Sequence, residues 1–234
     1  MKESRNINQT NGNVLINAAD ISRHYTMADG TVQALSNVSL KVNVGEFIAI
    51  TGPSGSGKST LMNILGLLDT CDSGTYMFSG VDTGMLSDVE LSRIRNEKIG
   101  FVFQAFNLIP TLSVLENVAL PLNYRGIPSA KRIARSKAAL EAVGLSARLS
   151  HKPYELSGGQ QQRAAIARAI AADPELILAD EPCGSLDSRS SKEVMELLRS
   201  RHECGKTVIL ITHDLDDAAY ADRILTVCDG KLYK

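Results

Sequence analysis

A glycine-rich segment directly after a short apolar run constrains the fold of this chain more than any other feature. Phe47–Thr51 predicts a β-strand, and it is followed by Gly52–Thr60 (GPSGSGKST) and then by an apolar helical pattern. The segment matches GxxxxGK[ST] in the strand–loop–helix context that gives this motif its meaning. Glycines let the backbone curl until successive N–H groups point at an anion, and the helix adds its positive N-terminal end. We therefore expect a phosphate-binding loop in an α/β fold.

The residues of this loop have distinct expected roles around a phosphate chain. Lys58 supplies a positive charge for the β- and γ-phosphates, Ser59 offers a hydroxyl to Mg²⁺, and Thr60 reaches the α-phosphate region. The candidate phosphate-binding residues are Gly52, Ser54, Gly55, Gly57, Lys58, Ser59 and Thr60. Phosphate binding alone does not distinguish a kinase from a GTPase or an ATPase.

Composition is that of an ordinary globular protein and weakens the case for nucleic-acid binding. The chain has 234 residues, 44% of them hydrophobic, which is enough to bury a core without metals or disulfides. Its 25 basic and 26 acidic residues give a net charge of −1, whereas proteins that wrap nucleic acid usually carry a basic surplus. The four cysteines, Cys71, Cys183, Cys204 and Cys228, form no CxxC pair, which favours a reducing, cytosolic compartment.

Apolar patterns predict strands near both ends of the chain and a mostly helical middle. The strand-like runs are 14–21, 38–42, 47–51, 74–78, 99–103, 176–179, 208–212 and 224–228, and the helical patterns are 58–67, 88–96, 114–119, 129–143, 158–171, 192–202 and 215–220. Continuous apolar runs suit strands of a parallel sheet covered on both faces. No run approaches 18 apolar residues, and the polar residues 1–13 have no signal-peptide pattern. We interpret 1–13 as a flexible tail and 14–234 as one domain, an α/β core carrying a helical insertion over about 87–172.

Two acidic residues end one of the predicted strands. Asp180 and Glu181 follow the apolar run Leu176–Ala179, and the carboxyl ends of parallel strands are where open α/β sheets bind ligands. Asp180 is the candidate Mg²⁺ ligand. Glu181 points differently and is the candidate base for a water that attacks the γ-phosphate.

A second glycine motif precedes a strong helix-forming segment. In Leu156–Gln160 (LSGGQ), Ser157 and Gln160 form a capping-box pattern, which accounts for a helix start. It leaves Gly158 and Gly159 unexplained, because a glycine in a helix costs about 1 kcal/mol relative to alanine. The pair indicates a backbone that approaches something closely, such as another phosphate.

These motifs in this order resemble the ATP-binding subunits of ABC transporters, over essentially the whole chain after the first dozen residues. The resemblance implies a P-loop NTPase (RecA-like) core with an antiparallel β edge and an inserted α-helical subdomain. It implies ATP and Mg²⁺ as ligands and a head-to-tail homodimer that sandwiches two ATP molecules. In that dimer Ser157, Gly158, Gly159 and Gln160 of one copy would cap the γ-phosphate bound by the other.

The resemblance also gives roles to residues whose pattern alone is uninformative. Gln104 matches the glutamine that senses Mg²⁺ and the γ-phosphate, His213 the histidine that contacts the γ-phosphate, and Asp187 the loop that meets the partner subunit. Tyr25 matches an aromatic residue that stacks on adenine; a partly buried strand tyrosine is the alternative, and His24 is a nearby competitor. Cys183 stands where that family pattern has threonine, and we expect it to be an inert thiol.

Within the family, segments such as 55–66 and 103–110 are similar to the macrolide-export and lipoprotein-release branch (MacB and LolD types). That similarity implies a transport-coupled ATPase at the cytoplasmic face of the cell membrane, paired with an integral-membrane permease of MacB or FtsX type. Export, lipoprotein release and mechanotransmission are the expected outputs, with no nucleic acid as partner. An FtsE-like regulator of cell-wall enzymes and, with less support, a soluble ABC ATPase acting on nucleic acid are the alternatives.

Overall fold

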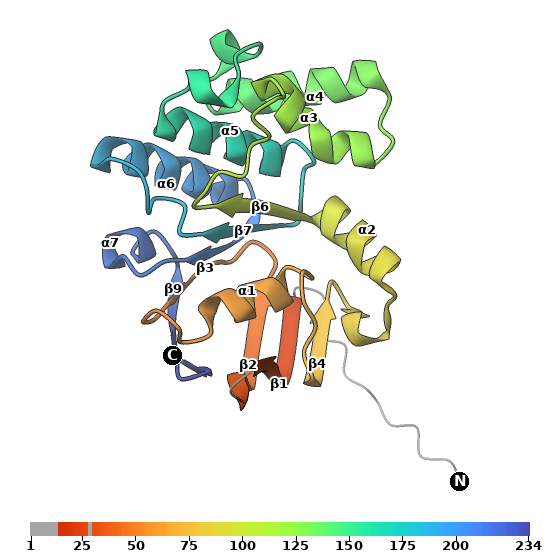
Figure 1. Ribbon diagram of the computed structural model, residues 1–234, viewed down its shortest axis with the longest axis vertical. Coiled ribbons are helices and arrows are strands. Elements are labelled where there is room, and N and C mark those ends of the chain that lie inside the picture. The colour runs from red at the N-terminus through yellow and green to blue at the C-terminus, as the bar shows by residue number, and fades with distance from the viewer. Residues whose placement is uncertain (1–13, 28–29) are drawn as a thin grey trace.

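The computed structural model describes residues 14–27 and 30–234 as layers stacked on either side of a central parallel sheet (Figure 1). The strands are β1 Val14–Met27, β2 Gly30–Asn43, β3 Phe47–Thr51, β4 Ser73–Phe78, β5 Val81–Asp82, β6 Ile99–Phe103, β7 Leu176–Asp180, β8 Thr207–Ile211, β9 Arg223–Cys228 and β10 Lys231–Tyr233. The helices are α1 Lys58–Leu65, α2 Asp88–Lys98, α3 Val114–Tyr124, α4 Ser129–Ala142, α5 Gly158–Ile170, α6 Ser188–Glu203 and α7 Leu215–Ala218. Short 3₁₀ turns cover Thr83–Met85, Ser146–Arg148 and Pro153–Glu155.

The central sheet has the order β10-β9-β3-β8-β7-β6, and all its neighbouring strands are parallel except the β9–β10 pair. Its inner strands β3, β7 and β8 are buried on both faces, as the continuous apolar runs predict, whereas β9 alternates buried and exposed residues. Successive side chains point to opposite faces, so Ile48 and Ile50 enter one core cluster and Phe47 and Ala49 enter the other. Because β3, β7 and β8 run parallel, their carboxyl ends lie at the same edge of the sheet.

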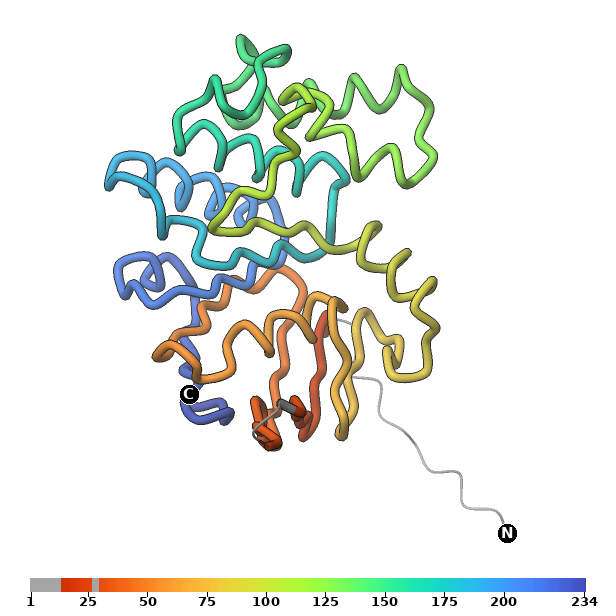
Figure 2. Tube along the Cα trace, in the orientation of Figure 1, coloured from red at the N-terminus to blue at the C-terminus, as the bar shows by residue number. Residues whose placement is uncertain are grey.

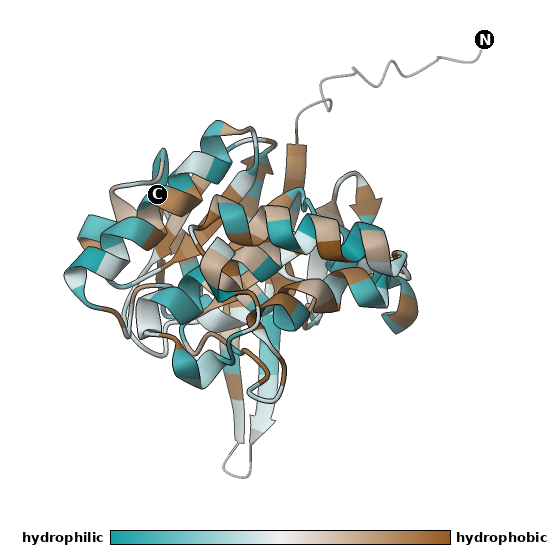
Figure 3. Ribbon diagram, turned by 90° about the horizontal axis from the view of Figure 1, so that it is seen from above, coloured by the Kyte–Doolittle hydropathy of each residue, from teal (hydrophilic) through white to brown (hydrophobic). Residues whose placement is uncertain are grey.

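One core cluster lies between the central sheet and a second, antiparallel sheet of order β2-β1-β4-β5. Helix α1 fills the space between the two sheets, with Leu61, Met62, Ile64 and Leu65 buried (Figures 1 and 2). The far end of the β1–β2 hairpin projects from the body of the molecule (Figure 3). The expected antiparallel edge is thus present, and it forms one wall of the α1 layer.

The other core cluster lies on the opposite face of the central sheet, under α5 and α6, with α3 and α4 packed farther out (Figure 1). In Figure 3 the helices carry both teal and brown segments, as expected for helices that bury one face. Ser87, Ser113 and Ser157 begin α2, α3 and α5 with capping boxes. Helices dominate residues 87–172, but β6 within that stretch pairs with β7 in the central sheet.

The expected elements are present, and the main differences are at their boundaries. Helix α3 continues past Ala119 to Tyr124 and contains Pro121, while α6 begins at Ser188 instead of 192 because Asp187 caps it. The short strands β5 and β10 have too few residues to show periodicity and were not expected. Residues 1–13, interpreted as a tail, lie outside the described residues. Among the described residues, no helix is both long and apolar enough to cross a membrane.

Candidate nucleotide site

The phosphate loop connects β3 to α1 and closes on itself through Lys58. The Lys58 ammonium donates to the carbonyl oxygens of Gly52 (2.7 Å) and Pro53 (2.8 Å). Gly57 precedes α1 with a left-handed φ of 108°. The first intrahelical bond runs from the N–H of Leu61 to the carbonyl of Gly57. The N–H groups of Lys58, Ser59 and Thr60 therefore have no intrahelical acceptor and are available to an anion.

Close backbone contacts hold the loop against β9 and the turn that follows it. A Cβ at Gly52, where φ is 143°, would lie 2.1 Å from the carbonyl oxygen of Val227. The carbonyl of Ser56 accepts a hydrogen bond of 2.9 Å from the N–H of Gly230. Ser54, Gly55 and Ser59 are exposed and Thr60 is half-buried. The anchored side of the loop is thus fixed by packing, and the rest of it faces solvent.

Asp180 ends β7 at the same sheet edge as the loop. Burial raises the pKa of its carboxyl group, the charge of Glu181 raises it further, and the Lys58 ammonium opposes both. Lys58 of the phosphate loop is therefore close enough to Asp180 for its charge to act on the carboxyl group. A carboxylate and the Ser59 hydroxyl are hard oxygen donors of the type that Mg²⁺ takes.

Glu181 adopts a left-handed backbone conformation with a φ of 46°, which breaks the strand alternation after Asp180. Its N–H donates to the carbonyl of Ile211 at 2.8 Å. Nδ1 of His213 lies 2.9 Å from Oε1 of Glu181. This contact raises the pKa of the largely exposed His213 imidazole, first through the hydrogen bond and then through the charge of Glu181. The structure thus brings these two candidate catalytic residues together.

Gln104 follows β6 and lies against the loop that continues from Glu181. A Cβ added at Gly184 would lie 2.7 Å from Nε2 of Gln104, so the glutamine side chain packs on that glycine. The Ser185 hydroxyl donates to the backbone carbonyl of Gln104 at 3.4 Å. Gln104 therefore contacts the loop that also carries Glu181.

The second glycine motif begins α5, in another layer. Ser157 accepts from the N–H of Gln160 and donates its own N–H to the Gln160 amide oxygen, which is the expected capping box. A Cβ at Gly159 would lie 2.5 Å from Oγ of Ser190, whereas one at Gly158 would meet only ordinary contacts. Packing on α6 accounts for a glycine at 159, and no close contact accounts for the glycine at 158. The expected approach of both glycines to a phosphate stays a prediction.

Asp187 precedes α6 and caps it through a 2.9 Å hydrogen bond from the N–H of Ser190. The N-termini of α1 and α5 lie on the same side of the molecule (Figure 1), yet they pack on opposite faces of the central sheet. The phosphate loop and the Ser157–Gln160 segment of one chain consequently do not form a single pocket.

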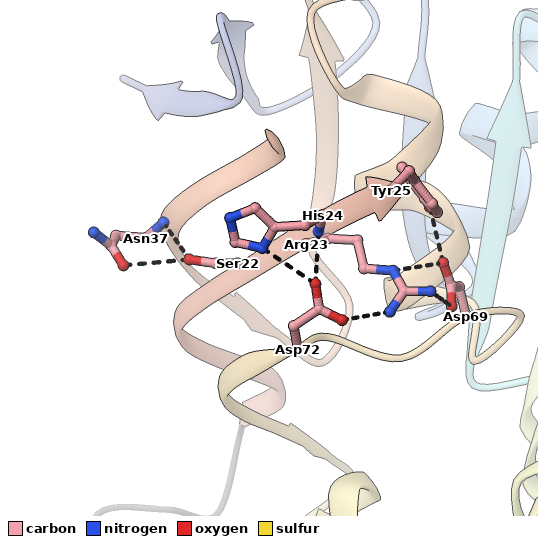
Figure 4. A network of polar contacts seen from close by, with 7 residues as sticks. All are labelled: Ser22, Arg23, His24, Tyr25, Asn37, Asp69 and Asp72. Carbon is pink, nitrogen blue, oxygen red and sulfur yellow. Dashed lines mark hydrogen bonds and ion pairs between the residues drawn. The ribbon is translucent and has the colours of Figure 1, made fainter. Parts of the chain in front are cut away.

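Tyr25 lies near the end of β1 inside a polar network (Figure 4). Its hydroxyl donates to Asp69 at 2.8 Å, and the Arg23 guanidinium lies 5.0 Å from its ring centre. Arg23 in turn makes a bidentate contact with Asp69 through Nε and a terminal nitrogen. The competing residue His24 instead faces Asp72, at 3.3 Å from Nδ1. These contacts fix the Tyr25 ring. Asp72 also accepts from Arg23 at 2.6 Å, so His24 is joined to the Tyr25 network through Asp72 and Arg23 but does not contact Asp69 (Figure 4).

Sequence reasoning missed Gln162, Arg168, Arg23 and Asp69. Gln162 is fully buried in α5 and contacts the backbone next to both Gln104 and Glu181. Arg168 donates to the carbonyls of Phe106 and Asn107. A polar residue on the apolar face of the predicted helix 158–171 was the available signal for Gln162.

Comparison with known proteins identifies the family of this chain. Residues 35–184 match the family model described as ABC transporter. The chain belongs to the ABC transporter family, as an ATP-binding cassette with ATPase activity, in agreement with the fold and the phosphate loop.

Two groups of relatives show which branch of the family this chain is similar to. The chain is 49% identical over 213 residues to an uncharacterized ABC transporter ATP-binding protein of Thermotoga maritima, covering 91% of each. It is 50% identical over 221 residues to the macrolide export ATP-binding/permease protein MacB of Brucella melitensis. The matched region covers 94% of this chain but only 34% of that protein, about a third of its length. The expected similarity to the macrolide-export branch is confirmed.

Among solved structures, the chain is similar to the ATP-binding cassette MJ0796, described as a dimer in a post-hydrolysis state bound to ADP and Pi. The TM-score is 0.87 at 44% identity, covering 94% of this chain and 97% of that one. A second dimeric MJ0796 structure, a bacterial ABC transporter cassette, gives the same TM-score at 45% identity. The expected fold class is confirmed, including the P-loop NTPase core.

Proposed function

We propose that two copies of this chain dimerise head to tail on ATP and that hydrolysis powers an integral-membrane permease of MacB or FtsX type. The observation that carries the proposal is the shared sheet edge where Lys58, Asp180 and the Glu181–His213 pair come together. Export, lipoprotein release or mechanotransmission would be the output. The relatives support a permease partner, because MacB carries ATP-binding and permease functions in one protein by its name.

The phosphate loop and Tyr25 bind the nucleotide. The N–H groups of Lys58–Thr60 and the Lys58 ammonium bind the phosphates. The fixed ring of Tyr25 stacks on adenine, an interaction worth about 1–3 kcal/mol for base–aromatic contacts. Ser59 and Asp180, with Gln104, would hold Mg²⁺, which neutralises charge on the phosphates when it is bound.

The residues that follow β6, β7 and β8 carry out hydrolysis. Glu181 accepts a proton from the attacking water, and its left-handed backbone aims it away from the direction of Asp180. His213 donates to the γ-phosphate oxygens as charge develops there, and its raised pKa favours the protonated donor. Gln104, packed on Gly184, orients the reacting groups.

Dimerisation supplies what one chain lacks. Residues Ser157–Gln160 of the second copy would cap the γ-phosphate, and Asp187 would lie at the contact between copies. The separation of α1 and α5 on opposite faces of the sheet supports this division. We further propose that the helical part of residues 87–172 receives the permease, which would hold the domain at the cytoplasmic face of the membrane.

Substitution of Glu181 tests the proposal. Glu181→Gln keeps the shape of the side chain but removes the base, so we expect no turnover and an ATP-dependent dimer stable enough for size-exclusion chromatography. Glu196→Gln, an exposed carboxylate on α6, is the matched control and should retain full turnover. Full turnover in Glu181→Gln would refute the base assignment.

Capture of the partner is the second test. Glu181→Gln protein with ATP and Mg²⁺ is used as bait in detergent-solubilised membranes, and captured proteins are identified by mass spectrometry. A stoichiometric permease is the expected result. Recovery of soluble proteins or nucleic acid alone would contradict the membrane role while leaving the ATPase in place.

A further inference from the structure

Gln162 is a fully buried amide in the second turn of α5, between the end of β6 and the loop that follows β7. Its Nε2 donates to the carbonyl of Pro182 at 2.6 Å and to the carbonyl of Phe103 at 3.2 Å. Both partners are acceptors, so the NH₂ end of the amide must face them. One side chain thus joins α5 to two different loops.

Both contacted carbonyls adjoin residues of the proposed reaction. Phe103 directly precedes Gln104, and Pro182 directly follows Glu181. On the other side, Arg168, also on α5, donates to the carbonyl of Phe106 at 2.8 Å. The backbone around Gln104 is therefore held from α5 at two points, and the backbone after Glu181 at one.

Packing alone does not account for a glutamine at this position. The amide oxygen Oε1 of Gln162 is buried and has no hydrogen-bond donor among residues 14–27 and 30–234. Burying an amide with one end unsatisfied costs free energy that methionine or leucine would avoid. The two donated hydrogen bonds are the contribution that an apolar side chain of similar size cannot make.

The helix that carries Gln162 begins at Ser157, in the segment proposed to contact the nucleotide of the second copy. A helix is rigid over so short a distance, and the capping box at Ser157 fixes its start. A rigid-body shift of α5 that starts at Ser157 would therefore act on the carbonyls of Phe103 and Pro182 through the Gln162 amide.

We infer that Gln162 is a positioning residue that sets Gln104 and Glu181 in their reactive places when the start of α5 engages nucleotide. The inference rests on the proposed function, because it needs Gln104 and Glu181 to act in hydrolysis. Gln162 itself touches neither the nucleotide nor the water in this arrangement. Its loss should affect turnover and leave nucleotide binding at the phosphate loop intact.

Gln162→Met tests this, because methionine keeps the length and volume of glutamine but has no N–H donor. We expect kcat for ATP hydrolysis to fall roughly 10- to 100-fold, the range expected when reacting groups are misplaced. The affinity for ATP and the ATP-dependent dimer of the double variant with Glu181→Gln should stay within about twofold of the parent. Gln162→Asn, whose amide is one methylene too short, should change kcat in the same direction.

Thr207→Val is the matched control. The buried Thr207 hydroxyl accepts from the N–H of Gly45 at the opposite end of the central sheet, so this variant also removes a buried hydrogen bond. It should lower the melting temperature but keep kcat near that of the parent.

A kcat for Gln162→Met within about twofold of the parent would overturn the inference. So would parallel losses of kcat and ATP affinity, or failure of both Gln162 variants to fold, since each indicates a purely structural role. Failure of the proposed function is distinguishable, because it would appear as an inactive parent or a fully active Glu181→Gln.

Discussion

Nδ1 of His213 and Oε2 of Glu181 lie 2.8 Å apart, which joins the loops that follow β7 and β8 at the edge of the central sheet. The Glu181 side chain is mostly covered, while 72% of the His213 side chain is exposed. The imidazole can therefore leave this contact without disturbing the core. The raised pKa of His213 therefore depends on its contact with Glu181.

Removal of the Glu181 charge should lower the pKa of His213. Glu181 raises that pKa in the folded protein, so this contact stabilises the fold at low pH and the stabilisation is lost as pH rises through the folded pKa. In Glu181→Gln, an NMR titration of the His213 ring should give a midpoint below that of the parent. An unchanged midpoint would contradict the contact.

Lys58→Ala should weaken ATP binding by at least about tenfold, because a charge-assisted hydrogen bond contributes about 1.5–3 kcal/mol. The measurement is isothermal titration calorimetry with ATP and Mg²⁺. Lys192→Ala, an exposed lysine that pairs with Glu196, is the control. Equal ATP affinity in Lys58→Ala and the parent would remove Lys58 from the site.

The two glycines at the start of α5 should respond differently to alanine. Gly159→Ala should destabilise the fold by about 1–3 kcal/mol, since its Cβ would lie 2.5 Å from Oγ of Ser190. Gly158→Ala should leave the melting temperature unchanged or raise it, but should reduce the ATP-dependent dimer of Glu181→Gln. Addition of Ser190→Gly to Gly159→Ala should restore part of the lost stability. Equal stability of the two alanine variants would contradict this interpretation.

The ring of Tyr25 should contribute to ATP binding and its hydroxyl group to the stability of the fold. Tyr25→Ala removes the stacking surface and should weaken ATP binding by about 1–3 kcal/mol. Tyr25→Phe keeps the ring and loses only the hydrogen bond to Asp69, so ATP affinity should change little while stability falls by about 1 kcal/mol. Fluorescence titration with a labelled ATP and thermal denaturation measure the two effects. ATP affinity unaffected by Tyr25→Ala would favour the alternative of a structural strand tyrosine.

Cys183 should resist alkylation in the folded protein. Burial raises the pKa of its thiol to about 12, so almost none is present as the reactive thiolate at neutral pH. Iodoacetamide at pH 8 should modify the exposed Cys204 long before Cys183, as read by peptide mass spectrometry. Modification of Cys183 at the same rate as Cys204 would show that the thiol is accessible and reactive.

The sequence predicts the parts of this fold that depend on local pattern. The apolar runs at Phe47–Thr51 and Leu176–Asp180 are long enough and uniform enough to identify buried strands, and the GPSGSGKST motif determines the loop between β3 and α1. The strands β5 and β10 are too short to carry a period of two, so pairing with their neighbours is what defines them.

The contacts made by the missed site residues are tertiary, and the spacing of residues along the chain does not predict them. Gln162 and its partner carbonyls at Phe103 and Pro182 are far apart in the chain. Asp69 likewise meets Tyr25 only because α1 packs between the two sheets. Gly159 likewise has a packing contact that the motif does not reveal, because a Cβ there would meet Ser190 of the neighbouring helix. Its expected role at a phosphate stays a prediction.

The left-handed backbone at Glu181 sets the stability of the fold against the base role that we propose for this residue. Side chains with a Cβ are disfavoured at a φ of 46°, and glycine or asparagine accepts that conformation more readily than glutamate does. Of the residues that favour this conformation, glycine and asparagine lack a carboxylate, and aspartate keeps one on a side chain that is one methylene shorter. A laboratory selection for heat resistance alone should drift toward Gly, Asn or Asp at 181. Under the proposed base role, survivors with Gly or Asn would be folded proteins that no longer turn over ATP.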